Sequence, residues 1–467
     1  MTKTINDLYA LIRNNVLNSM GVERTLIQLL EDKDIGRVKS LLQNRDSIVE
    51  EAIKEYNPML HDVMSRRDKD RQGKKPYISE KLPRDRQRYI NEVELFFLLG
   101  NPIKWQLTTE DGDSDTFAEF TSFLRSMRFN TIMRQAKRTA GAETEAAILF
   151  HIYQDNAGTA SVAPIVLSHS KGYILRPLFD QYGNLLAFGY GYSLKEGPST
   201  VEHFDIETPS TIYEARKGNI GWEVTSRPNP TEKINVIYIQ QPKAWEGAQQ
   251  RIAREEKMDS GIADTNNYFA DPIAAVTVDA LKSLPDPNVP GGVVQLTKEG
   301  RFEYINPPIA SELQANEKRD LNTSILFDTF TPDLSFEAMK GLGTLSGEAI
   351  RRAMALGYMK RDNLREIYDI AVDRAKNLIL AIMSKVTHIG LASKLEALEI
   401  EHDFAEPFNE DVTQTWTALG RAVNDGIMSL ETAVKKMGVA DNPEEEIQRI
   451  RESQASQSMN SLIEPNF

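Results

Sequence analysis

The sequence contains no cysteine in its 467 residues. Disulfide scaffolds, cysteine-based zinc sites, iron–sulfur clusters and thiol catalysis are therefore excluded. It also has no run of 18 consecutive apolar residues, so we expect no membrane span. The N-terminus is polar and of mixed charge and lacks an apolar signal core, so we expect the protein to remain where it is made.

Basic residues are also fewer than acidic ones. Lys and Arg total 55 against 68 Asp and Glu, which gives a net charge of −13. This balance argues against a protein that coats nucleic acid through bulk positive charge, but it does not exclude one past which DNA slides without sticking. With 40% apolar and 26% charged residues, the chain has the composition of ordinary globular material, and its length favours two to four domains.

Phosphate-binding and nucleophile motifs are missing as well. No GxxxxGK[ST] segment occurs, so we expect no NTPase activity. Gly341 and Gly343 lack the third glycine and the preceding buried strand of a dinucleotide fingerprint, and a flexible loop that ends in a Ser346 N-cap fits better. The tripeptide Ser168–Ser170 resembles a nucleophile–base pair only superficially, and a polar strand end is the better interpretation.

Metal-binding patterns are weak. The six histidines show no HExxH or similar spacing. The segment DGDSD at 111–115 lacks the glycine and the glutamate that a calcium loop needs at its sixth and twelfth positions, so it favours an acidic flank of the following helix. We therefore predict no metal, no cofactor and no enzymatic activity. The enzyme alternative is a metal-dependent nuclease that uses Asp111, Asp113 and Asp115.

Hydrophobic periodicity divides the first half of the chain. Helical spacing covers residues 1–58, 88–99 and 117–140. Between 66 and 88, ten Lys/Arg against four Asp/Glu with Gly73, Pro76 and Pro83 predict a basic loop or arm. A solvated interface arm is the favoured interpretation, and contact with phosphates is the alternative. From 144 to 240 the period changes to two, and the predicted strands are 147–153, 161–167, 175–179, 185–192, 201–207, 211–215, 222–225 and 234–239.

The second half alternates long helices with irregular segments. A polar helix is predicted at 244–264, and residues 270–307 hold five prolines with strand-like pieces at 292–296 and 302–305. A second polar helix follows at 308–327, then a loop to 346. The longest helical pattern runs from Gly347 to Ile389, about 60 Å at 1.5 Å per residue, with a kink expected at Gly357. A strand at 398–404 and a helical unit at 409–437 precede a tail rich in Glu, Ser and Gln.

Several segments carry a resemblance to a known family. LSGEAIRRAMALGYMK at 345–360 resembles the Ser-Gly-x-Ala-Ile helix start of tailed-bacteriophage portal proteins of the siphophage type. Residues 400–404, Pro407–Asn409 and the GIMSLET segment at 426–432 resemble that family's C-terminal strand and helix, and LFFLLGNPIK at 95–104 resembles its "llG-x-P" segment. Together, in this order, these segments extend the resemblance over nearly the whole chain.

This resemblance implies an α+β portal fold that assembles as a ring, usually of twelve subunits. The ring would occupy one capsid vertex of the virion after assembly in the host cytoplasm. Mapped onto this chain, the implied parts are a helical and β-rich wing at 1–243, a first stem helix at 244–269, a small α/β clip at 270–307, a second stem helix at 308–327, a tunnel loop at 328–346, a long kinked helix with the wing return at 347–408, and a crown with the C-terminal tail at 409–467.

The implied function is a channel for double-stranded DNA, loosely bound, during packaging and ejection. Expected partners are further copies of the chain, the terminase large subunit, neck or adaptor proteins, and the major capsid and scaffold proteins. The tunnel-loop candidates are Phe330, Asp333, Leu334, Phe336, Lys340, Gly341 and Gly343. The channel-face candidates on the second stem helix are Glu312, Glu317, Lys318 and Arg319, and the interface-arm candidates are Arg66, Arg67, Arg84, Arg86 and Arg88. The alternative is a capsid-associated neck or adaptor protein without its own DNA channel.

Overall fold

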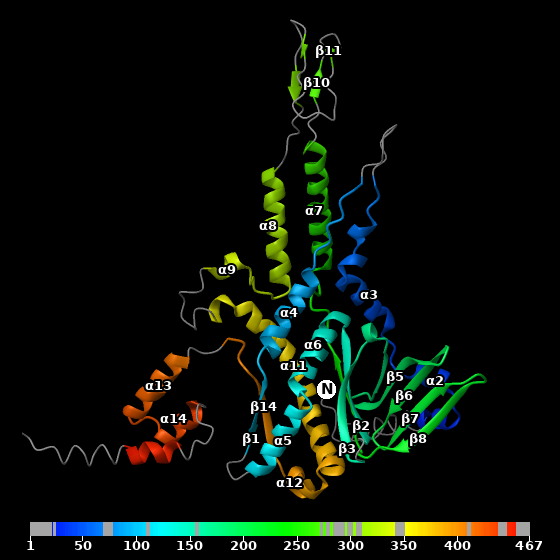
Figure 1. Ribbon diagram of the computed structural model, residues 1–467, viewed down its shortest axis with the longest axis vertical. Coiled ribbons are helices and arrows are strands. Elements are labelled where there is room, and N and C mark those ends of the chain that lie inside the picture. Colours follow the sequence, from blue (N-terminus) through cyan, green and yellow to red (C-terminus); the bar gives the residue numbers. More distant parts are fainter. Residues whose placement is uncertain are drawn as a thin grey trace, which may run out of the picture. The chain divides into compact units, whose positions relative to one another are not determined.

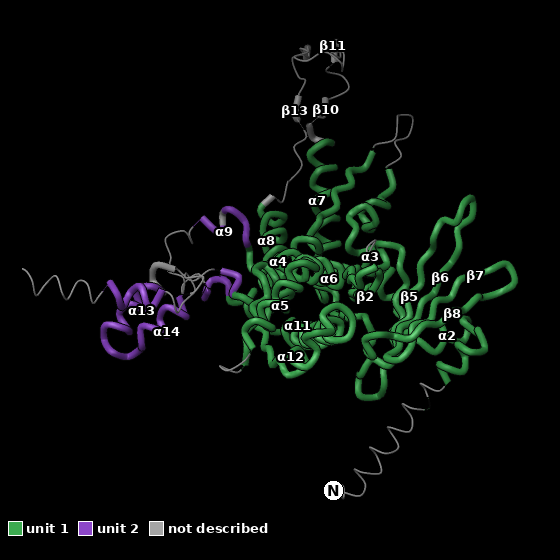
Figure 2. The backbone as a smooth tube through the Cα atoms, turned by 60° about the horizontal axis from the view of Figure 1, so that its bottom comes forward, with its two compact units in different colours: residues 1–333, 355–405 green, residues 334–354, 406–467 purple. Residues whose placement is uncertain are grey.

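The computed structural model describes residues 21, 25–68, 78–108, 113–154, 158–270, 274–276, 281–283, 295–296, 302–304, 311–340, 351–408, 412–437 and 446–453. The chain divides into two compact units. The first contains residues 1–333 and 355–405, and the second contains residues 334–354 and 406–467 (Figure 2). Each unit has its own packing.

Three helices form the centre of the first unit: α4 (Arg86–Leu99), α6 (Phe129–Glu143) and α11 (Ala355–Ile382) (Figure 1). They share one apolar cluster, in which Leu95 and Leu98 of α4 pack with Met133 of α6 and Leu378 of α11. Helix α4 is enclosed on more than one side, so its buried residues are not confined to one stripe. It ends at Gly100, as the Gly-Asn-Pro sequence predicts.

Two antiparallel sheets lie beside this helical core. One has the order β3-β2-β9, from β2 (Glu145–Gln154), β3 (Ala160–Leu167) and β9 (Val236–Gln240). The other is a meander of β4 (Ile174–Phe179), β5 (Leu185–Glu196), β6 (Ser199–Glu207), β7 (Thr211–Lys217) and β8 (Trp222–Pro228). Phe188 and Leu175 of the meander pack against Leu149 and Leu167 of the smaller sheet. The meander's other face packs on α2 (Ile35–Leu41) through Phe204.

Smaller elements complete the body of the first unit. Strand β1 (Ile103–Leu107) pairs with β14 (Ile400–Phe404), which joins segments almost 300 residues apart. Further helices are α3 (Asp46–Tyr56), α5 (Ser114–Ser126) and α12 (Ala392–Glu396), with 3₁₀ turns at Pro58–Leu60, Asp62–Ser65, His169–Lys171 and Ile389–Leu391 and a π-helical turn at Met383–Thr387.

A helical hairpin, the stem, extends from this body (Figure 1). It consists of α7 (Gln249–Ala270) and α8 (Ser311–Asp328). Between them in sequence, β10 (Ala274–Val276) pairs with β13 (Phe302–Tyr304), and β11 (Leu281–Ser283) pairs with β12 (Gln295–Leu296). The second unit contains α9 (Phe336–Lys340), α13 (Val412–Asn424) and α14 (Leu430–Met437).

The mixed α+β class and the β-rich block are confirmed, but some predicted helices are wrong. The single helix expected at 117–140 is two helices, because Arg128 has a left-handed conformation (φ 54°) that ends α5 and lets Phe129 begin α6 in a new direction. The first stem helix begins at Gln249 rather than 244, since Ala244 and Trp245 form a buried turn in which the Trp245 indole donates to Glu55 (2.8 Å).

The long helical pattern is present from 351 to 387, but it is interrupted by a turn at Met354 and ends in the π-helical turn Met383–Thr387. Helix α11 has 28 residues, about 42 Å, and is preceded by a turn at Met354. Gly357 is not at a kink. It lies inside α11 where a Cβ would come within 2.3 Å of the Phe97 ring, so its missing side chain allows α4 and α11 to approach closely. The start of the pattern at 347–350 lies outside the described residues.

Within the described residues, no single helix has the length and apolarity to cross a membrane. One pair of helical segments, Ala355–Thr387 with Ile389–Glu396, meets the length and composition test together but bends by 116°. The apolar side of α11 is part of the buried core described above.

Candidate functional site: the stem and its base

One side of α7 is acidic and buried. Its carboxylates are covered by residues 78–86 and by Arg66, which lie along the helix. Asp264 accepts from Arg66 (2.7 Å), Glu255 accepts two bonds from Arg86 (2.7 and 3.0 Å), and Asp259 pairs with Arg84. The Glu255 carboxylate raises the pKa of Arg86 above its ordinary value. Buried carboxylates need such partners, so this segment of the predicted basic arm is part of the stem's own packing.

His61 holds a second segment against α7. Its Nδ1 lies 2.6 Å from the Glu256 carboxylate and its Nε2 lies 2.6 Å from the Glu55 carbonyl. Both partners are acceptors, so both ring nitrogens donate and the imidazole is protonated. Burial alone would lower the pKa of His61, but these hydrogen bonds raise it above its ordinary value. The base of the stem therefore contains a buried imidazolium–carboxylate pair.

The two stem helices are joined by ion pairs. Arg254 pairs with Glu317 (2.7 Å), Lys318 pairs with Asp259 (2.8 Å), and Arg251 pairs with Asp328. Burial would raise the pKa of Asp259, but the bonds from Lys318 and Arg84 lower it below its ordinary value. The pairs Arg254–Glu317 and Arg251–Asp328 are largely exposed, and pairs of that kind each contribute about 0–1 kcal/mol, whereas Lys318 reaches the buried Asp259.

The side of α8 that faces away from α7 is exposed. Of the four predicted channel-face residues, Glu317 and Lys318 turn toward α7, while Glu312 and Arg319 are exposed. Leu313, on the same helix, is 72% exposed. A helix this open is stable only with further neighbours or many side-chain pairs. Of the four predicted residues, Glu317 and Lys318 are therefore engaged within the hairpin, whereas Glu312 and Arg319 lie on its open side.

Lys360 of α11 connects the roots of both stem helices. Its ammonium donates to the Thr329 carbonyl just after α8 (2.7 Å), to the Ala244 carbonyl before α7 (3.2 Å) and to the Thr331 hydroxyl (3.2 Å). The side chain is buried. Burial lowers the pKa of Lys360 to about 8, against the opposing effect of Glu94.

Glu94 of α4 is the carboxylate of this cluster. It lies 3.2 Å from the Lys360 ammonium and 2.5 Å from the ammonium of Lys137, which is fully buried on α6. Burial alone would raise the pKa of Glu94, but the two ammonium groups hold it below its ordinary value. Gln241 extends the cluster to the Tyr368 hydroxyl (2.7 Å). We call Glu94, Lys137 and Lys360 the root cluster.

The predicted tunnel-loop residues fall in both units. In the first unit, Phe330 has a left-handed backbone (φ 49°) and is 37% exposed. In the second unit, Phe336 begins the short helix α9 and is 78% exposed, and Lys340 ends that helix. Asp333 ends the first unit and Leu334 begins the second. Gly341 and Gly343 lie outside the described residues.

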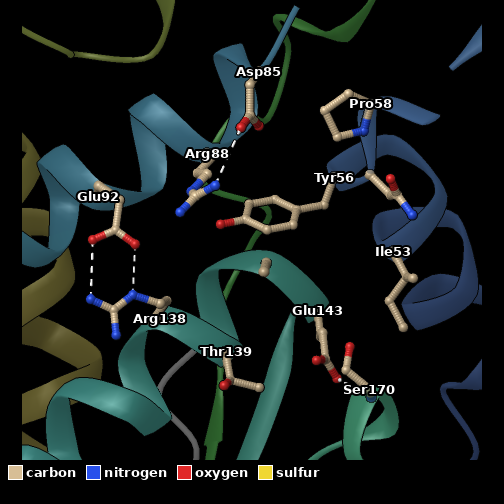
Figure 3. Close-up of a pocket in the computed structure, with 12 residues that line it drawn as sticks. Ile53, Tyr56, Pro58, Asp85, Arg88, Glu92, Arg138, Thr139, Glu143 and Ser170 are labelled. Atoms are coloured by element: carbon tan, nitrogen blue, oxygen red, sulfur yellow. Dashed lines mark hydrogen bonds and ion pairs between the residues drawn. The ribbon is translucent and has the colours of Figure 1, made fainter. Parts of the chain in front are cut away.

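Two arm candidates are exposed. Arg67 lies on the surface, and Arg88 is 67% exposed beside Asp85 (3.7 Å). Arg88 borders a cavity of about 870 Å³ between α3, α4 and α6, where Arg138 pairs with Glu92 (Figure 3). The five predicted arm residues are therefore divided: Arg66, Arg84 and Arg86 bind α7, and Arg67 and Arg88 face solvent.

The two weak motif matches in the sequence, DGDSD at 111–115 and Ser168–Ser170, each have a structural explanation. Asp113 is the N-cap of α5, where it accepts from the Thr116 N–H (2.9 Å), and this confirms the helix-flank interpretation of DGDSD. Lys394 lowers the pKa of Asp113 to about 2. His169 follows β3 and lies 3.2 Å from Glu145. Asp111 lies outside the described residues, and those that are described contain no group of three or more His, Asp or Glu able to hold a metal.

The fold is an α+β body on which a polar helical hairpin is anchored. The family model described as "Phage portal protein, SPP1 Gp6-like" matches residues 30–459. The chain belongs to this family of phage portal proteins, which confirms the resemblance drawn from the sequence. The family is one of structural proteins of the phage head-to-tail connection, so the chain has a portal or connector role.

Solved structures that match the chain include subunits of gene transfer agent (GTA) particles. The neck of a native GTA particle, computed with C12 symmetry, is 11% identical, with a TM-score of 0.43 over 77% of this chain and 91% of that one. The neck of an empty GTA particle, computed with C6 symmetry, is 10% identical, with a TM-score of 0.39 over 76% and 90%. The virion of a native gene transfer agent is 12% identical, with a TM-score of 0.35 over 78% and 88%. No curated protein matches the chain.

Proposed function

We propose that copies of this chain assemble into a closed ring of about twelve subunits at one capsid vertex, with the stem around a channel for double-stranded DNA. Membership of the phage portal family supports the ring. The observation that carries the channel assignment is the open side of α8, which keeps Glu312, Arg319 and Asp320 exposed in the single chain. In a ring, neighbouring stems on two sides and a water-filled channel on another would explain such a helix.

The charge of the chain suits a conduit. Each phosphate contact made by a Lys or Arg adds salt-sensitive affinity, which would slow a moving duplex. A net charge of −13 per subunit, repeated around a ring, repels DNA from the wall. In the stem, most basic side chains are already paired with carboxylates, as in Arg254 with Glu317. The proposed channel therefore holds DNA loosely.

We assign partners to segments of the chain by the roles that the portal resemblance implies for those segments. The clip at 270–307 would dock the terminase large subunit, which supplies the ATPase, and later a neck or adaptor protein. The wing would contact the major capsid and scaffold proteins. These assignments rest on the parts that the sequence resemblance implies, and membership of the portal family over residues 30–459 supports them.

A loop deletion tests the DNA path. Removing residues 333–343 should leave rings intact, because the root cluster lies outside this segment, but it should block DNA packaging. Normal DNA-filled heads from such a phage would contradict the assignment. The neck or adaptor alternative predicts oligomers without a hole that could admit duplex DNA.

The structure shows which of the predicted arm arginines can be used to test for an interface. Reversal of Arg84 or Arg86 would break ion pairs within the stem, so those variants report on folding. Arg67→Glu and Arg88→Glu change exposed charges instead. If the arm contacts another subunit or the capsid, these two variants should fold normally and impair incorporation into procapsids. Unchanged incorporation would count against an interface arm.

A further inference from the structure

A second cavity of the first unit lies between α11, the β4–β5 turn and the loop before β9. Its volume is about 530 Å³, within the size range of small-ligand sites. Ile370, Arg374 and Leu378 line it from α11, and their spacing of four residues places them on one side of the helix. Arg374 therefore occupies the middle of this wall.

The other walls of the cavity are partly apolar. Phe179 at the end of β4 and Leu185 at the start of β5 border it, and the Phe179 ring centroid lies 6.0 Å from that of Tyr238. On the α11 wall, the Ile370 side chain is 72% exposed. An organic ligand could therefore cover apolar surface here in addition to meeting the charged groups.

Arg374 has hydrogen-bonding capacity that the described residues do not use. Its Nε donates to the Val236 carbonyl of β9 (3.2 Å), which is the guanidinium's one hydrogen bond within the described part of the chain. The two terminal nitrogens have no partner there, and they are not closed off from solvent. Burial lowers the pKa of Arg374, and no carboxylate among the described residues counteracts this. A guanidinium stays charged in proteins, so this half-buried group calls for an anion.

Lys233 adds a second cation from the loop before β9. Its ammonium donates to the Asn377 carbonyl of α11 (3.1 Å), about one turn beyond Arg374. Burial lowers the pKa of Lys233, and the positive charges of Lys385 and Arg374 lower it further, so these cations lie near one another. Glu232 is the one carboxylate among the described residues that border the cavity, and it is paired with Lys385. Lys233 and Arg374 therefore have no carboxylate partner in that part of the chain.

The loop fixes the backbone of Lys233 before any ligand arrives. The Lys233 carbonyl accepts from the Asn229 side chain (2.7 Å) and from the Thr231 hydroxyl (2.9 Å). The Lys233 N–H donates to the same hydroxyl (3.2 Å), and Asn229 and Thr231 are both buried. A site that is ordered in advance loses less conformational entropy on binding.

We propose that this cavity binds a carboxylate that is attached to an apolar group. The carboxylate accepts two parallel hydrogen bonds from the terminal nitrogens of Arg374 and a further one from the Lys233 ammonium. The apolar group covers Ile370 and Phe179, which inorganic phosphate has no means to do. The net charge of −13 disfavours the phosphates of a nucleic acid. An acidic side chain of another protein and a free organic acid both offer this chemistry.

The experiment is a calorimetric titration of the full chain with phenylacetate at pH 7 and fixed ionic strength. We expect saturable binding in the millimolar range, as for other ligands of this size. Phenylacetamide has the same shape without the charge, so it should bind at least tenfold more weakly. Inorganic phosphate should also bind more weakly than phenylacetate, because it leaves the apolar walls uncovered.

Three variants locate the site. Arg374→Gln should weaken phenylacetate binding at least tenfold, and Arg374→Lys, which keeps the charge but loses the paired nitrogens, should weaken it about threefold or more. Lys233→Gln alters an exposed side chain, so it should fold normally and weaken binding about threefold or more. The control Lys195→Gln removes the same charge from an exposed position on β5, about 33 Å along the strand from Leu185, and should change binding less than twofold.

One further probe distinguishes the sources. Tighter binding of N-acetylglutamic acid methylamide than of phenylacetate supports an acidic side chain of a protein as the occupant, and weaker binding supports a free organic acid. The proposal is overturned if phenylacetamide or inorganic phosphate binds as tightly as phenylacetate. It is also overturned if Arg374→Gln and Lys233→Gln bind phenylacetate like the wild type.

Discussion

The substitution Glu94→Gln tests the root cluster most severely. It removes the one carboxylate that lies between the ammonium groups of Lys137 and Lys360 while keeping the volume of the side chain. Two cations then share a buried space, and neither can reach water because both side chains are buried. Removal of one partner from a buried ion pair costs about 3–5 kcal/mol of unfolding free energy. We expect a loss in that range at pH 7.

The assay is urea unfolding of the purified chain followed by circular dichroism, with Glu202→Gln as the matched control. Glu202 pairs with Lys217 at 3.0 Å, but both side chains are 52% exposed. The same chemical change there should cost less than about 1 kcal/mol. The comparison separates the effect of burial from that of the amide.

A double variant tests whether the cluster acts as a unit. In Glu94→Gln/Lys360→Met only the Lys137 ammonium remains, and it keeps its bond to the Asn91 side-chain oxygen (3.1 Å). The double variant should therefore lose less stability than the two single variants added together, by about 1–3 kcal/mol. The reasoning is refuted if Glu94→Gln costs no more than Glu202→Gln, or if the two single losses add.

The remaining predictions concern the stem root, a buried histidine and a helix contact. Lys360→Met should speed amide hydrogen exchange at residues 329–331 by more than tenfold, because two carbonyl partners at the stem roots lose their donor; unchanged exchange would contradict the link. The raised pKa of His61 means that its contribution to stability is complete below pH 6.5 and is lost as the pH rises through its folded-state value, so His61→Gln should cost more at pH 6 than at pH 9 in urea unfolding; equal losses would contradict the protonated assignment. Gly357→Ala should cost about 1–3 kcal/mol because the new methyl group meets Phe97, whereas Gly420→Ala, with open space around it, should be neutral or stabilising; equal effects on the thermal midpoint would contradict the close contact.

The β-rich block could be predicted from the sequence because its short segments have a period of two and are separated by turn residues, although the first half of β2 is buried on both faces and β8 has no buried residue. The alternation from 144 to 240 predicts β2 to β9 with errors of a few residues at their ends. Strand β1 (Ile103–Leu107) is missed. Its partner β14 lies almost 300 residues later, and five residues after a Gly-Asn-Pro stop carry little periodicity of their own.

The surroundings of the charged residues could not be predicted in the same way. Arg84 and Arg86 form part of a basic stretch in the sequence, but their partners are carboxylates of α7 about 170 residues away. Local composition therefore predicts an exposed arm, whereas in the fold these two arginines are paired with carboxylates of α7. Glu94 and Lys360 are hidden for a related reason, because a charge within an amphipathic helix is typical of its solvent face. A polar residue on the core side of such a pattern would be the available signal.

The polar inner face of the meander illustrates a further limit. The alternation of β6 correctly places Asp205 and Glu207 on one side, but it does not say that this side faces a second sheet. Only the packing of β2 and β3 over it encloses these carboxyl groups. Burial then raises the pKa of Glu207 to about 7.

The central claim is that this chain forms a ring whose stem surrounds a path for DNA. Electron cryomicroscopy of the purified full-length protein, with mass photometry alongside, tests it most directly. The account predicts closed rings of about twelve copies with a central hole wide enough for duplex DNA and with α7 and α8 around that hole. A closed oligomer without a hole, or a ring in which α8 lies away from the channel, would contradict it.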